Sequence, residues 1–376
     1  CAADRPSSPL PILATLILAQ LIHPLFAMTY PPIRTVLVTG ANGYLGSHIV
    51  EQLLGKGYDV HACVRDANNE ASVDHLLGIA PSRAGGKLSL FSTGDMGDES
   101  LRGRYREPLL GCDAVVHAAS PLSPKFSGEF DGIRDMLDPG MEGTRELLDA
   151  LLEWSPSIRC LVLTSSMSAA APRPEPDVKD ESHWSDDAAQ LSRGNHYGCL
   201  KTRQERLCGD WARTHMDRRT LSSDFRFCAI CPTMILGPPV GAGGEGRSYS
   251  PSGTMGSLHR WITGGRTSAP NDSMSFVHVR DCAAMHVAAL ENAGGGASGR
   301  YFSLVESWHW NDILTTLEGL HPGMPLDAPY RYEGDDVVAP TKFNLERMIS
   351  LGVEVTGIKE ILAECIDFFK KKGALE

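Results

Sequence analysis

Short β-branched and aliphatic runs alternate along the chain with segments whose apolar residues recur at helical spacing, beginning at Thr35. The run Thr35–Thr39 predicts a buried strand, and Leu45, Ile49 and Leu53 then share one face of a predicted helix. A second strand is predicted at 59–64. A strand, a turn, a helix and a second strand form a βαβ unit, which is the building block of a parallel doubly wound sheet.

The same alternation continues to the C-terminus. Further strands are predicted at 88–93, 114–118, 159–164, 225–231, 274–279 and 301–305. Helices are predicted from Pro139, over 194–214, over 281–292 and near the C-terminus. We expect Pro232 to end its strand, and the many Gly, Pro and Ser residues of 237–256 to form a mobile loop.

This order of elements predicts an α/β fold with a Rossmann-type doubly wound parallel sheet and a smaller C-terminal substrate-binding region. The dinucleotide-binding core is expected over 33–235. The remainder, 236–376, is expected to be mainly substrate-binding, with some segments returning to the core, because ligands bind outside the carboxyl ends of parallel strands.

The first 32 residues do not fit this pattern. No Asp, Glu, Lys or Arg occurs from Ser7 to Ile33, and Pro24 interrupts the apolar run early, whereas a membrane span needs about 20 apolar residues. The segment also lacks the basic start and the small-residue cleavage site of a signal peptide. We place 1–32 outside the fold, as an extension or leader remnant of unknown role, and membrane or complex association through it stays open.

Composition excludes several classes of function. The 35 Lys and Arg against 46 Asp and Glu give a net charge of −11, which disfavours nucleic-acid binding. The 10 cysteines are spread through the chain and are interpreted as reduced core residues. Cys228 and Cys231 lie in an apolar run without a second pair, so we expect strand packing and no metal site. A cytoplasmic location is favoured, and the apolar N-terminus leaves an organellar or membrane-associated one open.

The first candidate site is the glycine turn after the first strand. Gly40 permits a tight turn, Gly43 lets the backbone approach a pyrophosphate, and Gly46 lets helix and strand pack closely. Between a predicted strand and helix, this spacing indicates dinucleotide binding. The candidate cofactor residues of this turn also include Asn42, Tyr44 and Leu45.

The end of the second strand is expected to bind the adenosine ribose. An acidic residue there binds the free 2′-hydroxyl of NAD, whereas an Arg accommodates the 2′-phosphate of NADP. Here Val64 stands where the acid is expected, and Arg65 follows. We therefore favour NADP(H), with NAD(H) left open because Asp66 could bind the ribose.

The second candidate site combines Tyr197 with Lys201. Residues four apart on a helix share one face, so a phenol and an ammonium can point into one cleft. A free tyrosine has a pKa of about 10. We expect Lys201, together with a positively charged oxidised nicotinamide, to lower the pKa of Tyr197 toward neutrality, which would make it an acid-base group.

The third candidate is Ser166, which follows the predicted strand 159–164. A hydroxyl there would face the ligand crevice and could donate a hydrogen bond to a carbonyl oxygen during hydride transfer. The glycine turn, this serine and the Tyr-Lys pair occur in that order along the chain. Unrelated packing needs would rarely produce the three together.

From Thr35 onward the chain resembles the extended short-chain dehydrogenase/reductases. Within them it is most similar to the branch of dihydroflavonol reductases, cinnamoyl-CoA reductases and aldehyde and ketone reductases. The segments that carry this resemblance include Val38–Ser47, Ala62–Asp66, Gly94–Met96, Val116–Pro121, Leu163–Ser166, Asp180–Trp184, Tyr197–Lys201, Cys231–Pro238 and Gly299–Tyr301.

The resemblance implies roles for further residues. Ser166, Tyr197 and Lys201 match the family's catalytic triad, in which the tyrosine protonates the carbonyl oxygen and the lysine holds the ribose. It also implies that Asp95 and Met96 lie near adenine. The other residues implied to lie along the dinucleotide are Ala118, Ala119, Ser120 and Pro232.

Three positions depart from the family pattern. Ala171 stands where dihydroflavonol reductases have an Asn that binds a hydroxylated ring, which argues against a flavonoid substrate. Ser72 stands near their second basic residue for the 2′-phosphate, so the NADP preference depends on Arg65. Glu142 stands where many extended relatives have the Asn of a proton relay, which leaves that relay undefined.

The sequence therefore predicts an NADP(H)-dependent enzyme that reduces a moderately apolar aldehyde or ketone, as a monomer or homodimer. Two alternatives stay open. One is a hydroxysteroid or sugar-nucleotide enzyme of the same family. The other is a non-catalytic NAD(P)-binding scaffold subunit of a larger complex, for which the apolar N-terminus is the only support.

Overall fold

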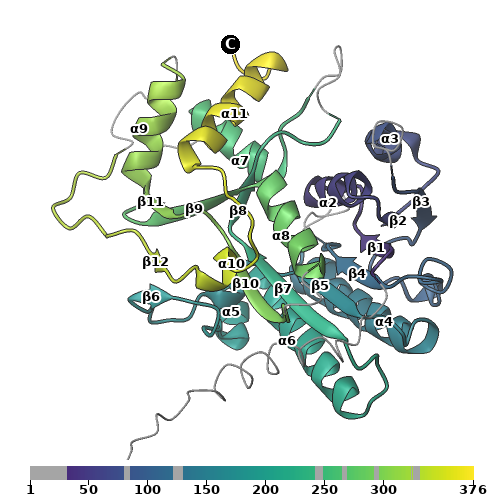
Figure 1. Ribbon diagram of the computed structural model, residues 1–376. Helices are drawn as coiled ribbons and strands as arrows, with labels where there is room; N and C mark the ends of the chain where they lie inside the picture. Colours follow the sequence, from purple (N-terminus) through teal and green to yellow (C-terminus); the bar gives the residue numbers. More distant parts are fainter. Residues whose placement is uncertain are drawn as a thin grey trace, which may run out of the picture. The chain divides into compact units, whose positions relative to one another are not determined.

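A seven-stranded parallel sheet forms the middle layer of the protein (Figure 1). The computed structural model describes residues 32–79, 85–121, 130–241, 249–264, 269–291, 296–322, 324 and 331–376, so the expectations for 1–31 lie outside it. The strands lie in the order β10–β7–β5–β4–β1–β2–β3. Their bounds are β1 Thr35–Thr39, β2 Asp59–Val64, β3 Leu88–Ser92, β4 Ala114–His117, β5 Cys160–Thr164, β7 Arg226–Pro232 and β10 Gly299–Ser303.

Helices cover both faces of this sheet. One face packs against α2 (Tyr44–Gly55), α3 (Glu70–Ile79) and α8 (Val279–Glu291). The other packs against α4 (Asp138–Trp154) and α6 (His196–Asp217). The order β3–β2–β1–β4–β5 with helices on both sides is that of a doubly wound sheet, so the predicted Rossmann-type α/β class is confirmed.

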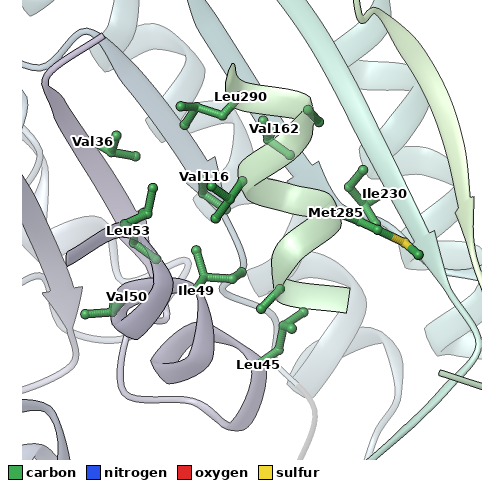
Figure 2. Packing of buried hydrophobic residues seen from close by; sticks show 14 of the residues in the cluster. Val36, Leu45, Ile49, Val50, Leu53, Val116, Val162, Ile230, Met285 and Leu290 are labelled. Carbon is green, nitrogen blue, oxygen red and sulfur yellow. The ribbon is translucent and has the colours of Figure 1, made fainter. Parts of the chain in front are cut away.

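The central strands β1, β4 and β5 are almost entirely apolar because both faces of the sheet are buried there. In β1, Val36 and Val38 pack on the side of α2 and α8, whereas Leu37 packs on the side of α4 and α6. Figure 2 shows the first of these two layers: Val116 from β4 lies among side chains of α2 and α8, such as Ile49. This packing positions the turn that joins β1 to α2.

Smaller elements form a second region built mostly from the C-terminal third of the chain. A three-stranded sheet has the order β11 (Ser307–His309), β9 (Ser273–His278) and β8 (Met234–Leu236). Beside it, α7 (Gly253–Ile262), α9 (Trp310–Leu320) and α11 (Ile358–Lys371) share one apolar cluster. The chain also returns to the main sheet after residue 236, since β10 and α8 belong to the central layers.

The remaining elements are short. β6 (Val178–Lys179) pairs with β12 (Lys342–Phe343) in a two-stranded parallel sheet. A π-helical segment, η3 (Ile133–Leu137), runs directly into α4. The other short helices are η2 (Glu99–Leu101), η4 (Met167–Ala170), α5 (Asp187–Ser192) and α10 (Glu346–Ile349).

Most predicted elements are present, and several boundaries differ by one to three residues. The strand expected over 225–231 lies at Arg226–Pro232, so Pro232 ends it as predicted, but as the last paired residue of β7, opposite Ser303 of β10. Proline is tolerated there because the neighbouring β5 has already ended at Thr164, opposite Ile230.

The prediction of a loop over 237–256 is only partly correct. Residues 242–248 lie outside the described part of the chain, but Gly253 begins α7. Met255, Leu258 and Ile262 are spaced so that one helical face is buried. The helix was not predicted because the glycines and serines around these residues are typical of loops.

The described cysteines are all free and buried, from Cys63 to Cys365. This confirms their interpretation as core residues, with Cys228 and Cys231 both inside β7; Cys1 lies outside the described residues. Within the described ranges, no group of three or more His, Cys, Asp or Glu side chains is arranged to hold a metal ion. No helix in this part of the chain is both long and apolar enough to cross a membrane.

Candidate active site

The turn between β1 and α2 forms a narrow cradle. Gly40 has a positive φ of 64°, and a Cβ added there would lie 2.8 Å from the Cα atom of Ala119. A Cβ on Gly46 would lie 2.1 Å from the carbonyl oxygen of Gly40. Gly43 caps α2 and donates its N–H to the Gly40 oxygen at 2.9 Å. Because side chains are excluded, backbone N–H groups at the start of α2 are left to face a phosphate.

The side chains between these glycines fix the turn to neighbouring segments. Asn42 donates to the carbonyl oxygen of Ser72 at 3.2 Å, and the Tyr44 hydroxyl donates to that of Gly237 at 2.6 Å. Leu45 is buried in the core. These contacts occupy the side chains of Asn42, Tyr44 and Leu45, and their predicted role in cofactor binding stays a prediction.

Arg65 directly follows β2, the strand that pairs with β1 beside the glycine cradle. Its side chain is 73% exposed, and Nε lies 3.8 Å from the Oδ1 atom of Asp95. Asp66 accepts the backbone N–H of Asn68 at 2.9 Å, so its carboxylate stabilises the local turn. Met96 packs against Gly143 of α4. The Arg65 guanidinium is thus exposed beside Asp95.

The segment after β4 lines the cradle from the other side. The N–H of Ala119 donates to the Thr39 hydroxyl at 3.2 Å, and Ala118 precedes it. The Ser120 hydroxyl is shielded from solvent and has no hydrogen-bond partner among the residues that the structure describes. A buried hydroxyl normally has a partner, so this group and the glycine cradle fit a polar ligand such as a dinucleotide.

Ser166, Tyr197 and Lys201 lie together near the carboxyl end of β5. Ser166 caps η4, where its hydroxyl accepts the N–H of Ser168 at 3.1 Å, and its side chain lies close enough to the Tyr197 hydroxyl to lower the pKa of that phenol. Lys201 donates to the carbonyl oxygen of Thr164 at 3.0 Å, and its Nζ lies 5.9 Å from the centre of the Tyr197 ring. The predicted triad is therefore spatially contiguous.

Comparison with known proteins places this arrangement in a family. The NAD-dependent epimerase/dehydratase family matches residues 36–304. A cinnamoyl-CoA reductase of Medicago truncatula is 31% identical over 348 residues, which covers 90% of this chain and 96% of that protein. This chain belongs to the NAD-dependent epimerase/dehydratase family.

Other members of the family extend the comparison. A dihydroflavonol 4-reductase of Arabidopsis thaliana is 28% identical and covers 91% of this chain and 84% of that protein. The crystal structure of a yeast methylglyoxal/isovaleraldehyde reductase complexed with NADPH has the same fold, with a TM-score of 0.73, 19% identity and coverage of 91% and 100%. The predicted resemblance to the reductase branch of the extended short-chain dehydrogenases is thus confirmed.

Burial dominates the electrostatics of the Tyr197–Lys201 pair in the chain without cofactor. Burial raises the pKa of Tyr197 above its ordinary value, and the Ser166 side chain lowers it only in part. Burial also lowers the pKa of Lys201 to about 8. In the chain without cofactor, loss of water around the phenol therefore dominates the pKa of Tyr197, and the expected lowering by Lys201 together with an oxidised nicotinamide stays a prediction.

Glu142, at the position of the family's relay Asn, lies at the surface of α4. Its carboxylate is 3.4 Å from the Arg145 guanidinium, and the side chain is 44% exposed. Nothing in this geometry connects it to Lys201, which is buried.

Sequence reasoning missed a buried charged pair beside the triad. Glu205 of α6 and Arg300 of β10 form an ion pair, and their side chains are 1% and 8% exposed. Two signals were available, since Glu205 stands one helical turn beyond Lys201 and Arg300 lies in the segment Gly299–Tyr301. Neither signal shows that the two residues meet.

Proposed function

We propose that this chain is an NADP(H)-dependent oxidoreductase that reduces an aldehyde or ketone to an alcohol. The observation that carries the proposal is the grouping of Ser166, Tyr197 and Lys201 at the carboxyl end of β5, two strands from the glycine cradle of β1. Family membership supports the reaction class, because the related reductases share nearly the whole length of the chain.

In the proposed reaction Tyr197 is the acid and Ser166 orients the substrate. The bound nicotinamide supplies the hydride to the carbonyl carbon. The Tyr197 hydroxyl donates its proton to the carbonyl oxygen, and the Ser166 hydroxyl donates a hydrogen bond to the same oxygen. A raised pKa suits this direction, because the phenol is then protonated at neutral pH. The Lys201 ammonium stabilises the phenolate left after proton transfer.

Arg65 supports the preference for NADP(H) over NAD(H). Its exposed guanidinium can form charge-assisted hydrogen bonds to a 2′-phosphate, for which a neutral ribose hydroxyl is a weaker partner. Asp95, 3.8 Å away, holds the guanidinium at the crevice edge.

The region 236–376 is proposed to bind the substrate, while 33–235 binds the cofactor. Support comes from chain geometry, because Pro232 ends β7 beside the crevice and the chain leads from it directly into β8 and the C-terminal cluster. Ala171 offers no polar group to a hydroxylated ring, so the proposed substrate is moderately apolar and not a flavonoid.

The test is a fluorescence titration with NADPH and NADH, followed by turnover assays with isovaleraldehyde, cinnamoyl-CoA, a dihydroflavonol, a hydroxysteroid and a UDP-sugar. We expect tighter binding of NADPH and turnover of the aldehyde or the thioester. Turnover of the steroid or UDP-sugar alone would replace the proposed substrate class. Cofactor binding without any turnover would favour the scaffold role.

Two variants test the role of Tyr197. Tyr197→Phe should lower kcat by roughly 100- to 10,000-fold while NADPH still binds, because the proton donor is lost. Tyr58→Phe is the matched control, since its hydroxyl bonds to Glu291 at 3.1 Å, away from the crevice. Turnover by Tyr197→Phe close to that of Tyr58→Phe would overturn the assignment.

A further inference from the structure

Glu205 lies on the same face of α6 as the proposed catalytic pair, because 197, 201 and 205 are spaced by one helical turn each. The Glu205 carboxylate accepts the Ser165 hydroxyl at 2.5 Å and the Nε and Nη2 atoms of Arg300, the latter at 3.5 Å. The Cys231 thiol lies 3.8 Å from the same carboxylate. These contacts of the buried anion are thus made at the carboxyl ends of β5 and β7 and with Arg300.

Arg300 connects the anion to the loop around η4. Its guanidinium donates to the carbonyl oxygens of Glu181 at 3.0 Å, His183, and Ala169 at 3.1 Å. It also stacks on the Trp184 ring, 3.9 Å from the ring centre. A lysine could not make these contacts, because only the planar guanidinium has several donors and a face for stacking.

These contacts enclose Ser166 on both sides along the chain. The residue before it, Ser165, is held by Glu205, and the last turn of η4, which Ser166 caps, is held at Ala169 by Arg300. The Ser166 hydroxyl is therefore fixed relative to α6, which also carries Tyr197. Buried ion pairs contribute little net stability, so stability alone is a weak reason for this one.

We propose that the Glu205–Arg300 pair is a positioning device that holds Ser166 against Tyr197 and supplies a fixed negative charge one helical turn from Lys201. The pair touches neither substrate nor cofactor in this proposal, which rests on the proposed reductase function.

The alternative is that the Glu205–Arg300 pair serves folding alone, and Arg226 is a suitable control residue for this alternative. It also donates to several carbonyl oxygens, those of Ala289, Leu290 and Ala297. It lies at the amino end of β7, however, whereas the triad lies at the carboxyl end of the neighbouring strand. Arg226→Lys therefore matches Arg300→Lys in chemistry without facing the site.

The experiment compares Glu205→Gln, Ser165→Ala, Arg300→Lys and Arg226→Lys in the full-length chain, using whichever carbonyl compound the wild type reduces. We expect Glu205→Gln and Arg300→Lys to lower kcat by about 10- to 100-fold with an NADPH Kd within about threefold of wild type, since a displaced hydroxyl slows chemistry more than cofactor binding. Ser165→Ala should lower kcat less, and Arg226→Lys should leave it unchanged.

The pH profile supplies a readout that a purely structural role would not move. The charged and titratable groups facing Lys201 are Tyr197, Glu205 and Cys208 on α6, Cys231 on β7 and His117 on β4. The charge of Glu205 raises the pKa of Lys201. Removing it in Glu205→Gln lowers the pKa of the remaining groups, so the alkaline limb of kcat/KM should move to lower pH. Arg300→Lys keeps the carboxylate and should not shift the limb downward.

The outcomes separate the two proposals. A wild type without turnover of any carbonyl compound rejects the proposed function. If the wild type is active and both Glu205→Gln and Ser165→Ala keep the wild-type kcat, the positioning role is rejected while the proposed reductase function stands. The positioning role is also rejected if Arg226→Lys and Arg300→Lys lose kcat equally and the alkaline limb does not shift in Glu205→Gln.

Discussion

Lys201 and Tyr197 are neighbours without a charge-stabilising hydrogen bond between them: Nζ lies 5.9 Å from the ring centre and donates to the Thr164 carbonyl oxygen. Burial dominates both groups, raising the pKa of the phenol and lowering that of the ammonium. Each group is therefore biased toward its neutral form. This bias suits the proton donation by Tyr197 that we propose.

The lowered pKa of Lys201 predicts a pH-dependent stability. Its pKa falls from 10.5 in the unfolded chain to about 8, so the unfolded state binds more protons between these values, and this group makes stability rise with pH there. The free energy of unfolding of the wild type, relative to that of Lys201→Met, should therefore increase by up to about 3 kcal/mol between pH 7 and pH 10. Urea unfolding of both proteins without cofactor measures this difference at each pH. A difference in the free energy of unfolding that does not change with pH would show that the pKa of Lys201 is not lowered.

A second prediction concerns the core between the sheet and α2. Ile49 of α2 is fully buried among residues of the sheet and of the covering helices (Figure 2). Ile49→Ala should therefore lower the free energy of unfolding by about 2–5 kcal/mol, because apolar burial is lost and a cavity is left. Glu51→Ala, two residues away on the same helix and partly exposed, should cost about 0.5 kcal/mol or less. Equal midpoints in urea for the two variants would contradict this packing.

Local patterns were sufficient to predict much of this protein. The strands Thr35–Thr39 and Asp59–Val64, the glycine turn between them and the Tyr-Lys spacing all depend on residues close in sequence. The two-stranded sheet of Val178–Lys179 and Lys342–Phe343 was not predicted, because strands of two residues have no periodicity to detect.

Properties that depend on distant parts of the chain were missed. Glu205 and Arg300 are 95 residues apart, and no local pattern shows that they meet. The expected fall in the pKa of Tyr197 considered the charges of Lys201 and an oxidised nicotinamide but not the burial of the phenol, which raises its pKa in the chain without cofactor. That burial results from packing of the whole domain.

The glycine cradle predicts a strong effect on cofactor binding. The Cβ of Gly46→Ala would lie 2.1 Å from the backbone oxygen of Gly40, so the turn must shift and the affinity for NADPH should fall by at least about 100-fold, as misplaced phosphate contacts are lost. Gly55→Ala in the same helix meets nothing within 4 Å and should leave binding unchanged. A titration with both variants checks this, and wild-type affinity in Gly46→Ala would contradict the cradle.

Arg65 predicts the cofactor preference and its dependence on salt. If its guanidinium binds the 2′-phosphate, Arg65→Ala should weaken NADPH binding by about 10- to 100-fold, the range of one or two charged hydrogen bonds, and leave NADH binding unchanged. Added salt should weaken NADPH binding to the wild type more than to the variant, because an exposed ion pair is screened. Arg145→Ala, which removes an exposed arginine paired with Glu142, is the control. Equal losses for NADPH and NADH in Arg65→Ala would assign the arginine to the shared part of the dinucleotide and remove the basis for the NADP preference.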